Sequence, residues 1–248
     1  MIPLRDDNPS RITPLVTISL VVACVIVFVW QLSLGGRGDQ QATYSLGLIP
    51  SVLFGIHHLP PALVLVPPAA TIFTSMFLHG GWMHIIGNML YLWIFGDNVE
   101  EVLGHVRYLL VYLACGLAAS VAHIALAPDS LVPTLGASGA IAGVMGMYLI
   151  WFPNNQVRVL AFRTITWMPA LLVIGLWIVL QLVLGMGELS TAGQQGGVAY
   201  AAHVGGATAG IIFGLVYRDR CRVQSERPSD LGWAPPRYRS PQTRYPYR

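Results

Sequence analysis

The sequence contains no lysine, and charged residues make up only 10% of its 248 positions, while 54% of them are hydrophobic. A soluble domain usually carries about 25% charged residues. So low a charge content excludes an ordinary soluble domain and indicates a membrane protein. All positive charge comes from arginine, and much of it lies in residues 218–248. Their proline, serine and tyrosine content predicts a disordered cytoplasmic tail rather than a folded nucleic-acid-binding surface.

Metal-binding and redox motifs are also missing. The three cysteines, Cys24, Cys115 and Cys221, form no C-x-x-C pattern. The H-E-x-x-H motif of zinc proteases is absent. No apolar segment holds the aspartate pair of an aspartyl protease, nor the charge pairs or repeats expected of a small transporter. We therefore predict no cofactor and no metal, although His79, His84 and His203 are an alternative set of metal ligands.

Long apolar segments dominate the remaining sequence, and a spanning helix needs about 20 such residues. They predict an all-α membrane protein, a six-helix domain over residues 13–217 with a short central fourth helix. A cytoplasmic N-terminus of residues 1–12 precedes it. The expected helices are Thr13–Leu34, Trp82–Val102, Tyr108–Leu126, Ser138–Phe152, Trp167–Met186 and Val198–Tyr217. The long loop of residues 35–81 is rich in proline and nearly uncharged, which fits either a membrane-interface segment or an ordinary hydrophobic loop.

The arginines predict the orientation, because cytoplasmic loops carry the excess of positive charge. With six spans, both termini share one side. That side would hold 13 of the 14 arginines and the other side only Arg37. Both termini are therefore expected in the cytoplasm. Asp97, Glu100 and Glu101 would then be solvated at the cytoplasmic end of the second helix.

Ser138 stands between glycines, in Gly136-Ala-Ser138-Gly139, where a loop meets the fourth helix. Glycine lets another backbone approach closely. The unpaired N–H groups and positive dipole of a helix N-terminus favour a developing oxyanion. This pattern suits a serine nucleophile, but taken alone it is more typical of a serine that caps a helix and of glycines that pack it.

His203 lies near the outer end of the sixth helix. Small residues recur at four-residue spacing on this helix and on the fourth: Gly206, Gly210 and Gly214, and Ser138, Ala142 and Gly146, with Gly139 and Gly143 alongside. Such stripes let helices pack closely. If the two stripes pack together, the Ser138 hydroxyl meets the His203 ring and forms a nucleophile–base pair. The alternative is a histidine that only bonds a neighbouring helix.

The second helix begins with three polar residues, His79, His84 and Asn88. His84 and Asn88 are four residues apart and share one helix face. Neutral donors at this outer end could face a substrate oxyanion. The alternative is that they only hydrogen-bond nearby loops. Gln181, the main polar residue of the fifth helix, is expected to join helices.

Three motifs together resemble those of rhomboid intramembrane proteases: His84-x-x-x-Asn88, Gly136-x-Ser138-Gly139 and Ala202-His203-x-x-Gly206. They stand on the second, fourth and sixth helices, in the order that this family has. The resemblance covers about Thr13 to Tyr217. It implies a rhomboid-like bundle and a serine endopeptidase.

The resemblance also implies residue roles. Ser138 attacks the scissile carbonyl, and His203 takes its proton and passes it to the leaving amine, without a carboxylate. The Ser138 backbone N–H, Asn88 and His84 form the oxyanion hole, and His79 structures the first loop. The supporting glycines are Gly136, Gly139 and Gly206. Two features of some family members are missing: Pro67–Thr71 stands in place of a Trp-Arg pair, and Ala142 in place of a tyrosine four residues after the serine.

The implied partners are the lipid bilayer and single-pass membrane proteins, which enter laterally between the second and fifth helices. The implied location is a bacterial inner membrane, with the active site opening to the extracytoplasmic side. The alternative is an inactive rhomboid-like protein that binds client helices. The presence of both Ser138 and His203 argues against it.

Overall fold

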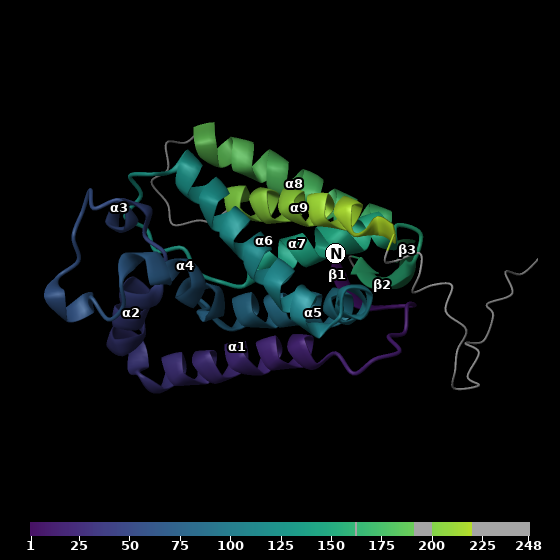
Figure 1. Cartoon of the computed structure of the whole chain (residues 1–248), viewed down its shortest axis with the longest axis horizontal. Helices are drawn as coiled ribbons and strands as arrows, with labels where there is room; N and C mark the ends of the chain where they lie inside the picture. The colour runs from purple at the N-terminus through teal and green to yellow at the C-terminus, as the bar shows by residue number, and fades with distance from the viewer. Residues whose placement is uncertain (162, 191–199, 220–248) are drawn as a thin grey trace, which may run out of the picture.

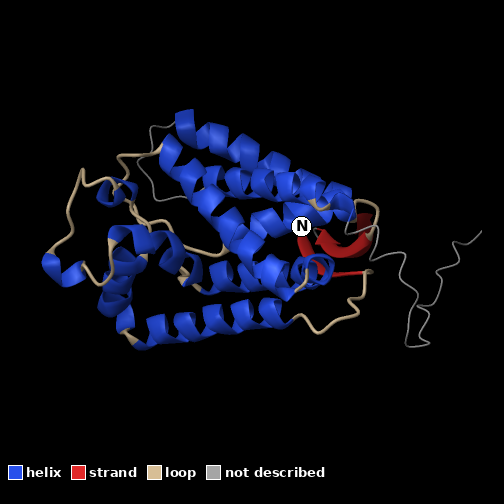
Figure 2. Ribbon diagram, viewed as in Figure 1, coloured by secondary structure: helices blue, strands red, loops and turns tan. Residues whose placement is uncertain are grey.

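The computed structural model describes residues 1–161, 163–190 and 200–219. These residues are mostly helical (Figures 1 and 2). Helices lie at all six predicted positions: α1 (Leu15–Ser33), α5 (Trp82–Leu103), α6 (His105–Leu126), α7 (Ser138–Trp151), α8 (Ala170–Ser190) and α9 (Tyr200–Val216). Residues 198–199 of the sixth predicted helix and 220–248 of the tail lie outside the described part.

The predicted loop of residues 35–81 contains short helices. They are α2 (Gly35–Leu46), α3 (Pro50–Leu53), η1 (Pro61–Leu63), η2 (Pro68–Ala70), α4 (Thr71–Thr74) and η3 (Ser75–Phe77). They form a separate lobe beside the long helices in Figure 1. Prolines begin three of these elements, where a missing N–H costs nothing.

The described helices differ in their capacity to cross a membrane. Only α1 and α6 are long and apolar enough on their own. Residues 61–77 and α5 pass together as a pair bent by 79°. Helices α7 and α9 and residues 170–185 of α8 are apolar but shorter. Length and composition therefore support two or three spans, fewer than the six predicted.

Helix α7 is the centre of the bundle. Almost every residue from Gly139 to Tyr148 is buried, including Ala142 and Val144 at 0% exposure. The helix ends at Trp151 because Pro153 disfavours a helical conformation for Phe152. Its short length leaves both ends inside the fold, so Ser138 begins the helix deep in the protein.

Glycines hold α7 against α9. A Cβ on Gly206 would overlap the carbonyl oxygen of Gly139, and one on Gly210 would overlap that of Gly143. Only glycine permits this backbone approach. The predicted packing of the two small-residue stripes is therefore confirmed.

A small antiparallel sheet at one end of the molecule corrects the all-α prediction (Figure 2). Its order is β1 (Ile2–Asp6), β2 (Gln156–Ala161) and β3 (Thr164–Pro169). Val157 and Val159 are buried, whereas Gln156, Arg158 and Leu160 are only partly buried. This alternation is the period of a half-buried strand. Residues 2–6, predicted as part of a simple N-terminus, pair with β2. Because β3 runs to Pro169, the fifth helix begins at Ala170 and not at Trp167.

The prediction that Glu100 is solvated is wrong, because this residue is fully buried. Its carboxylate accepts hydrogen bonds from the Val16 N–H, the Thr17 N–H and the Thr17 hydroxyl at 2.7–2.8 Å. It also contacts His105 at 2.5 Å. Helix α1 has no side-chain cap of its own. Glu100 therefore satisfies the free N–H groups at the start of α1 from the end of α5.

Candidate functional site

Ser138 and His203 lie within hydrogen-bond distance. Ser138 is the first residue of α7, and His203 lies in the first turn of α9. The Ser138 Oγ is 2.8 Å from the His203 Nε2. The close packing of α7 on α9 fixes this separation. The geometric prediction for this pair is confirmed; its catalytic role remains a prediction.

Gln181 contacts the other side of the His203 ring, which the sequence analysis did not foresee. Its Oε1 lies 2.7 Å from the His203 Nδ1. An amide oxygen only accepts hydrogen bonds, so Nδ1 carries the proton and Nε2 carries the lone pair. The Ser138 hydroxyl therefore donates to Nε2. This is the tautomer that a general base requires.

Trp177 also lies beside the His203 ring, with centroids 5.5 Å apart and planes tilted by 39°. It stands four residues before Gln181 on α8, on the same helix face. The family tyrosine expected four residues after the serine is Ala142 here. An aromatic neighbour for His203 thus comes from α8 instead of α7. The sequence signal that could have predicted this contact of α8 with His203 is Gln181, because a polar residue inside an apolar helix is a functional candidate.

Asn88 and His84 present hydrogen-bond donors near Ser138. The Nδ2 of Asn88 is buried and has no partner within the described residues. The Nδ1 of His84 accepts a hydrogen bond from the Gly80 N–H at 3.3 Å, so its Nε2 is the protonated nitrogen. That nitrogen faces Gly136, two residues before Ser138. Both donors are therefore available to a ligand.

Gly136 makes room for these donors. Its φ is +116°, a conformation that side-chain-bearing residues rarely adopt. A Cβ there would lie 2.6 Å from the His84 Nε2 and 3.5 Å from the Asn88 Nδ2. The glycine thus shapes the approach to Ser138. Its neighbour Gly139 instead packs α7 against Ala119 of α6.

His79 lies behind His84 and does not reach the Ser138–His203 pair. Its backbone N–H donates to Gln31 Oε1 at 3.0 Å, and its ring meets that of His84 edge-on at 5.1 Å. It joins the end of α1 to the start of α5. Among the described residues, no group of three or more histidine, cysteine or acidic side chains could hold a metal. The alternative metal site of His79, His84 and His203 is therefore wrong. The two ring nitrogens of His203 contact Ser138 and Gln181 instead.

These residues line one cavity of about 1450 Å³ between α5, α6, α7, α8 and α9. Its walls include Ser138, His203, Asn88 and His84 and also many apolar side chains. A cavity of this size is many times larger than one water molecule. The arrangement offers a nucleophile, a base and two free donors in one space.

Comparison with known proteins identifies the relatives. The family model of the Rhomboid domain matches residues 68–220. The chain is 29% identical over 203 residues to rhomboid protein 1, mitochondrial, of Saccharomyces cerevisiae, covering 76% of this chain and 56% of that protein. It is 41% identical over 92 residues to the rhomboid protease GluP of Bacillus subtilis, covering 37% of this chain and 17% of that protein.

A plant relative gives a similar match. RHOMBOID-like protein 1 of Arabidopsis thaliana is 29% identical over 178 residues, covering 71% of this chain and 42% of that protein. The matched part of the chain thus spans 56% of the length of the yeast relative and less than half of the other two. The family match covers more than half of the chain and contains Ser138, His203, His84 and Asn88. This chain is a membrane protein that belongs to the rhomboid family.

Proposed function

We propose that the chain is an intramembrane serine endopeptidase that uses Ser138 and His203 as a catalytic dyad. The observation that carries the proposal is the 2.8 Å contact between Ser138 Oγ and His203 Nε2, in a site where Asn88 Nδ2 has no partner within the described residues. A serine that merely caps α7 would need no histidine partner, and α7 has no side-chain cap bond. The similarity to the rhomboid protease GluP of Bacillus subtilis supports the proposed protease function.

The proposed reaction follows from the hydrogen bonds of the site. His203 Nε2 takes the Ser138 proton as Oγ attacks the scissile carbonyl carbon, and the resulting imidazolium gives that proton to the leaving amine. Water then hydrolyses the acyl-enzyme with the same base. The oxyanion is stabilised by Asn88 Nδ2, His84 Nε2 and the free N–H groups at the start of α7.

The proposed topology keeps all six long helices as spans of a domain over residues 13–217. The shorter helices α7, α8 and α9 would lie around the cavity, which water would fill. Irregular backbone is tolerated there because protein or water covers it. Residues 1–12 and 218–248 would face the cytoplasm, and the cavity would open to the opposite side. A bacterial inner membrane remains the predicted location.

The proposed substrates are single-pass membrane proteins that enter laterally between α5 and α8. A transmembrane helix hides its carbonyls in its own hydrogen bonds, so a substrate must unwind before Ser138 can attack. Helices with glycine or other weak helix formers near the outer surface are therefore preferred. The second candidate function, binding of client helices without cleavage, needs the same cavity but not the dyad.

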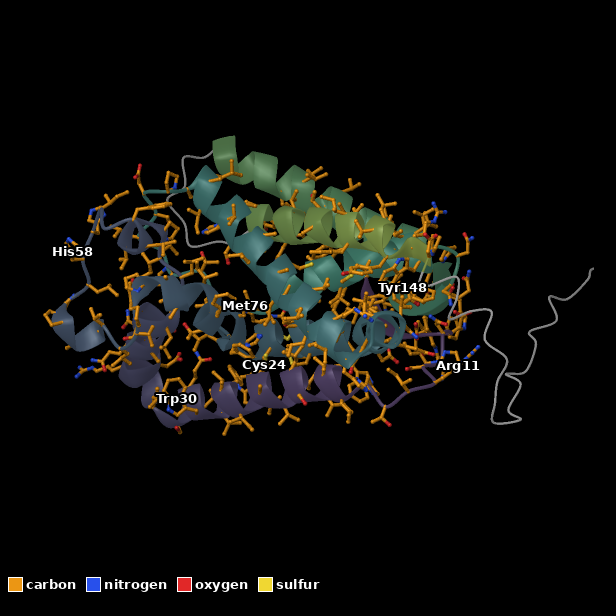
Figure 3. The ribbon with its side chains drawn as sticks, viewed as in Figure 1. Arg11, Cys24, Trp30, His58, Met76 and Tyr148 are labelled. Atoms are coloured by element: carbon orange, nitrogen blue, oxygen red, sulfur yellow. The ribbon has the colours of Figure 1, made fainter. Side chains whose placement is uncertain are left out.

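The test is cleavage of a single-pass substrate by the purified protein in detergent. Wild type should cleave, while Ser138→Ala and His203→Ala should reduce kcat by about 10³-fold or more. Matched controls are Ser19→Ala, whose exposed hydroxyl donates to the Leu15 carbonyl, and His58→Ala at the exposed edge of the molecule (Figure 3). Both should retain activity.

Two outcomes oppose the proposal. Cleavage that survives Ser138→Ala would refute the dyad. Absence of cleavage by folded wild type, together with no labelling of Ser138 by a fluorophosphonate probe, would favour the client-binding function.

A further inference from the structure

Helix α8 places a buried polar side chain among apolar neighbours in residues 170–185. Residues Leu176, Val179, Leu180 and Leu182 of this helix are 45–54% exposed, whereas Gln181 is 7% exposed. Burying an amide without a partner is unfavourable by a few kcal/mol. Among the described hydrogen bonds, the partner of its Oε1 is the His203 Nδ1. The sequence thus places a polar group on α8 at a position that meets the His203 ring.

We propose that Gln181 is a positioning residue that completes a Ser138–His203–Gln181 relay by holding the His203 ring. The inference rests on the proposed protease function and deepens it. Gln181 touches no reacting atom. Its role is to accept the Nδ1 proton at 2.7 Å and so keep the Nε2 lone pair pointed at Ser138.

The chemistry explains why an acceptor is needed at this position. A neutral imidazole has one N–H and one lone pair, and without a partner the two tautomers interconvert. Only the Nδ1–H form can take the serine proton through Nε2. Once His203 is protonated, the Nδ1–H bond becomes charge-assisted and strengthens. A neutral amide thus does here part of what a buried carboxylate does in a triad.

Trp177 restricts the remaining motion of the ring. It packs beside His203 from the same helix face as Gln181, with centroids 5.5 Å apart. The amide fixes the tautomer and the direction of the ring in its plane, and the indole limits tilting out of that plane. Because both contacts come from α8, the position of α8 sets the orientation of the base.

The rival explanation is that Gln181 only joins α8 to α9. A purely structural bond would affect stability or substrate binding but not the state of the histidine. Two substitutions separate these roles: Gln181→Leu removes the acceptor at similar volume, and Gln181→Glu keeps an acceptor at the same place. Leu180→Ala, an exposed neighbour on α8, controls for perturbation of the helix.

The experiment measures kcat and KM for cleavage of a single-pass substrate in detergent, with the unfolding temperature of each variant. Loss of a group that orients a functional histidine typically costs about 10- to 100-fold. Gln181→Leu should lower kcat by that factor with little change in KM. Gln181→Glu should recover most of the loss, and Leu180→Ala should behave as wild type.

Nuclear magnetic resonance provides a readout that does not depend on proteolysis. The ¹⁵N shifts of the His203 ring, assigned by difference from His203→Ala, report which nitrogen carries the proton. Wild type and Gln181→Glu should show a protonated Nδ1, and Gln181→Leu should show a mixture of tautomers.

The inference is overturned if Gln181→Leu leaves kcat and the tautomer unchanged, or if Gln181→Glu is as impaired as Gln181→Leu. Failure of wild type to cleave, or cleavage by Ser138→Ala, would instead refute the protease function. The tautomer measurement would still decide whether Gln181 positions the ring.

Discussion

At the scale of single residues, the unpartnered amide of Asn88 is the clearest sign that the cavity awaits a ligand. Asn88→Ala should lower kcat by about 10²- to 10³-fold with little change in KM, because the oxyanion forms only in the transition state. Steady-state cleavage measured with wild type and variant checks this. Asn98→Ala, on the same helix but bonded to the Asn8 carbonyl, should reduce stability and leave kcat unchanged. A wild-type kcat in Asn88→Ala would show that the Asn88 side chain is not part of the oxyanion hole.

Local spacing predicted Ser138, His203, His84 and Asn88 because each stands in a short motif on its own helix. Gln181 and Trp177 were missed as partners of His203 because these contacts join two different helices, with Gln181 and His203 22 positions apart. No spacing within one helix reports such a contact. The absent tyrosine at Ala142 indicated that the packing around the histidine differs, but not that α8 supplies the aromatic ring.

At the scale of elements, backbone contact between α7 and α9 makes glycine obligatory at their crossing. Gly210→Ala would force a Cβ onto the backbone of Gly143 and should destabilise the protein by about 1–3 kcal/mol. Thermal unfolding in detergent measures this effect. Gly175→Ala on α8 is the matched control, since its Cβ would meet nothing within 4 Å. It should be neutral or stabilising by up to about 1 kcal/mol. Equal effects of the two substitutions would contradict the packing argument.

The sequence predicted the six long helices because uninterrupted apolar length is a local property. The sheet escaped prediction because its strands are five or six residues long and β1 pairs with a segment about 150 positions later. Glu100 was misinterpreted for a related reason. A carboxylate near a helix end usually faces water, and its actual partners, Val16 and Thr17, lie more than 80 positions earlier.

At the scale of the whole molecule, Asp6 ties the sheet to the central helix. The Tyr148 hydroxyl of α7 donates to its Oδ2 at 2.6 Å, and Figure 3 shows Tyr148 at the strand end of the bundle. Burial raises the pKa of the Asp6 carboxyl to about 6, against the opposing effect of the Tyr148 hydroxyl. The folded state therefore holds this proton more tightly than the unfolded chain, whose aspartates titrate near 4.

The sign of the pH dependence follows from that difference. The contribution of Asp6 to stability is complete below about pH 4 and is lost as the pH rises through about 6. Asp6→Asn keeps an acceptor for Tyr148 but cannot ionise. Its unfolding temperature relative to wild type should therefore increase between pH 4 and 7. A difference that stays constant over this range would show that the carboxyl titrates alike in both states.

The cap that Glu100 places on α1 has a consequence for synthesis. Helix α1 is made before α5, and the carboxylate that satisfies the N–H groups of Val16 and Thr17 is added 83–84 residues later. Until α5 is complete, the start of α1 has no protein acceptor from Glu100, and its final position in the bundle is not fixed. A chain truncated before Glu100 would therefore carry an α1 whose first N–H groups lack this carboxylate acceptor.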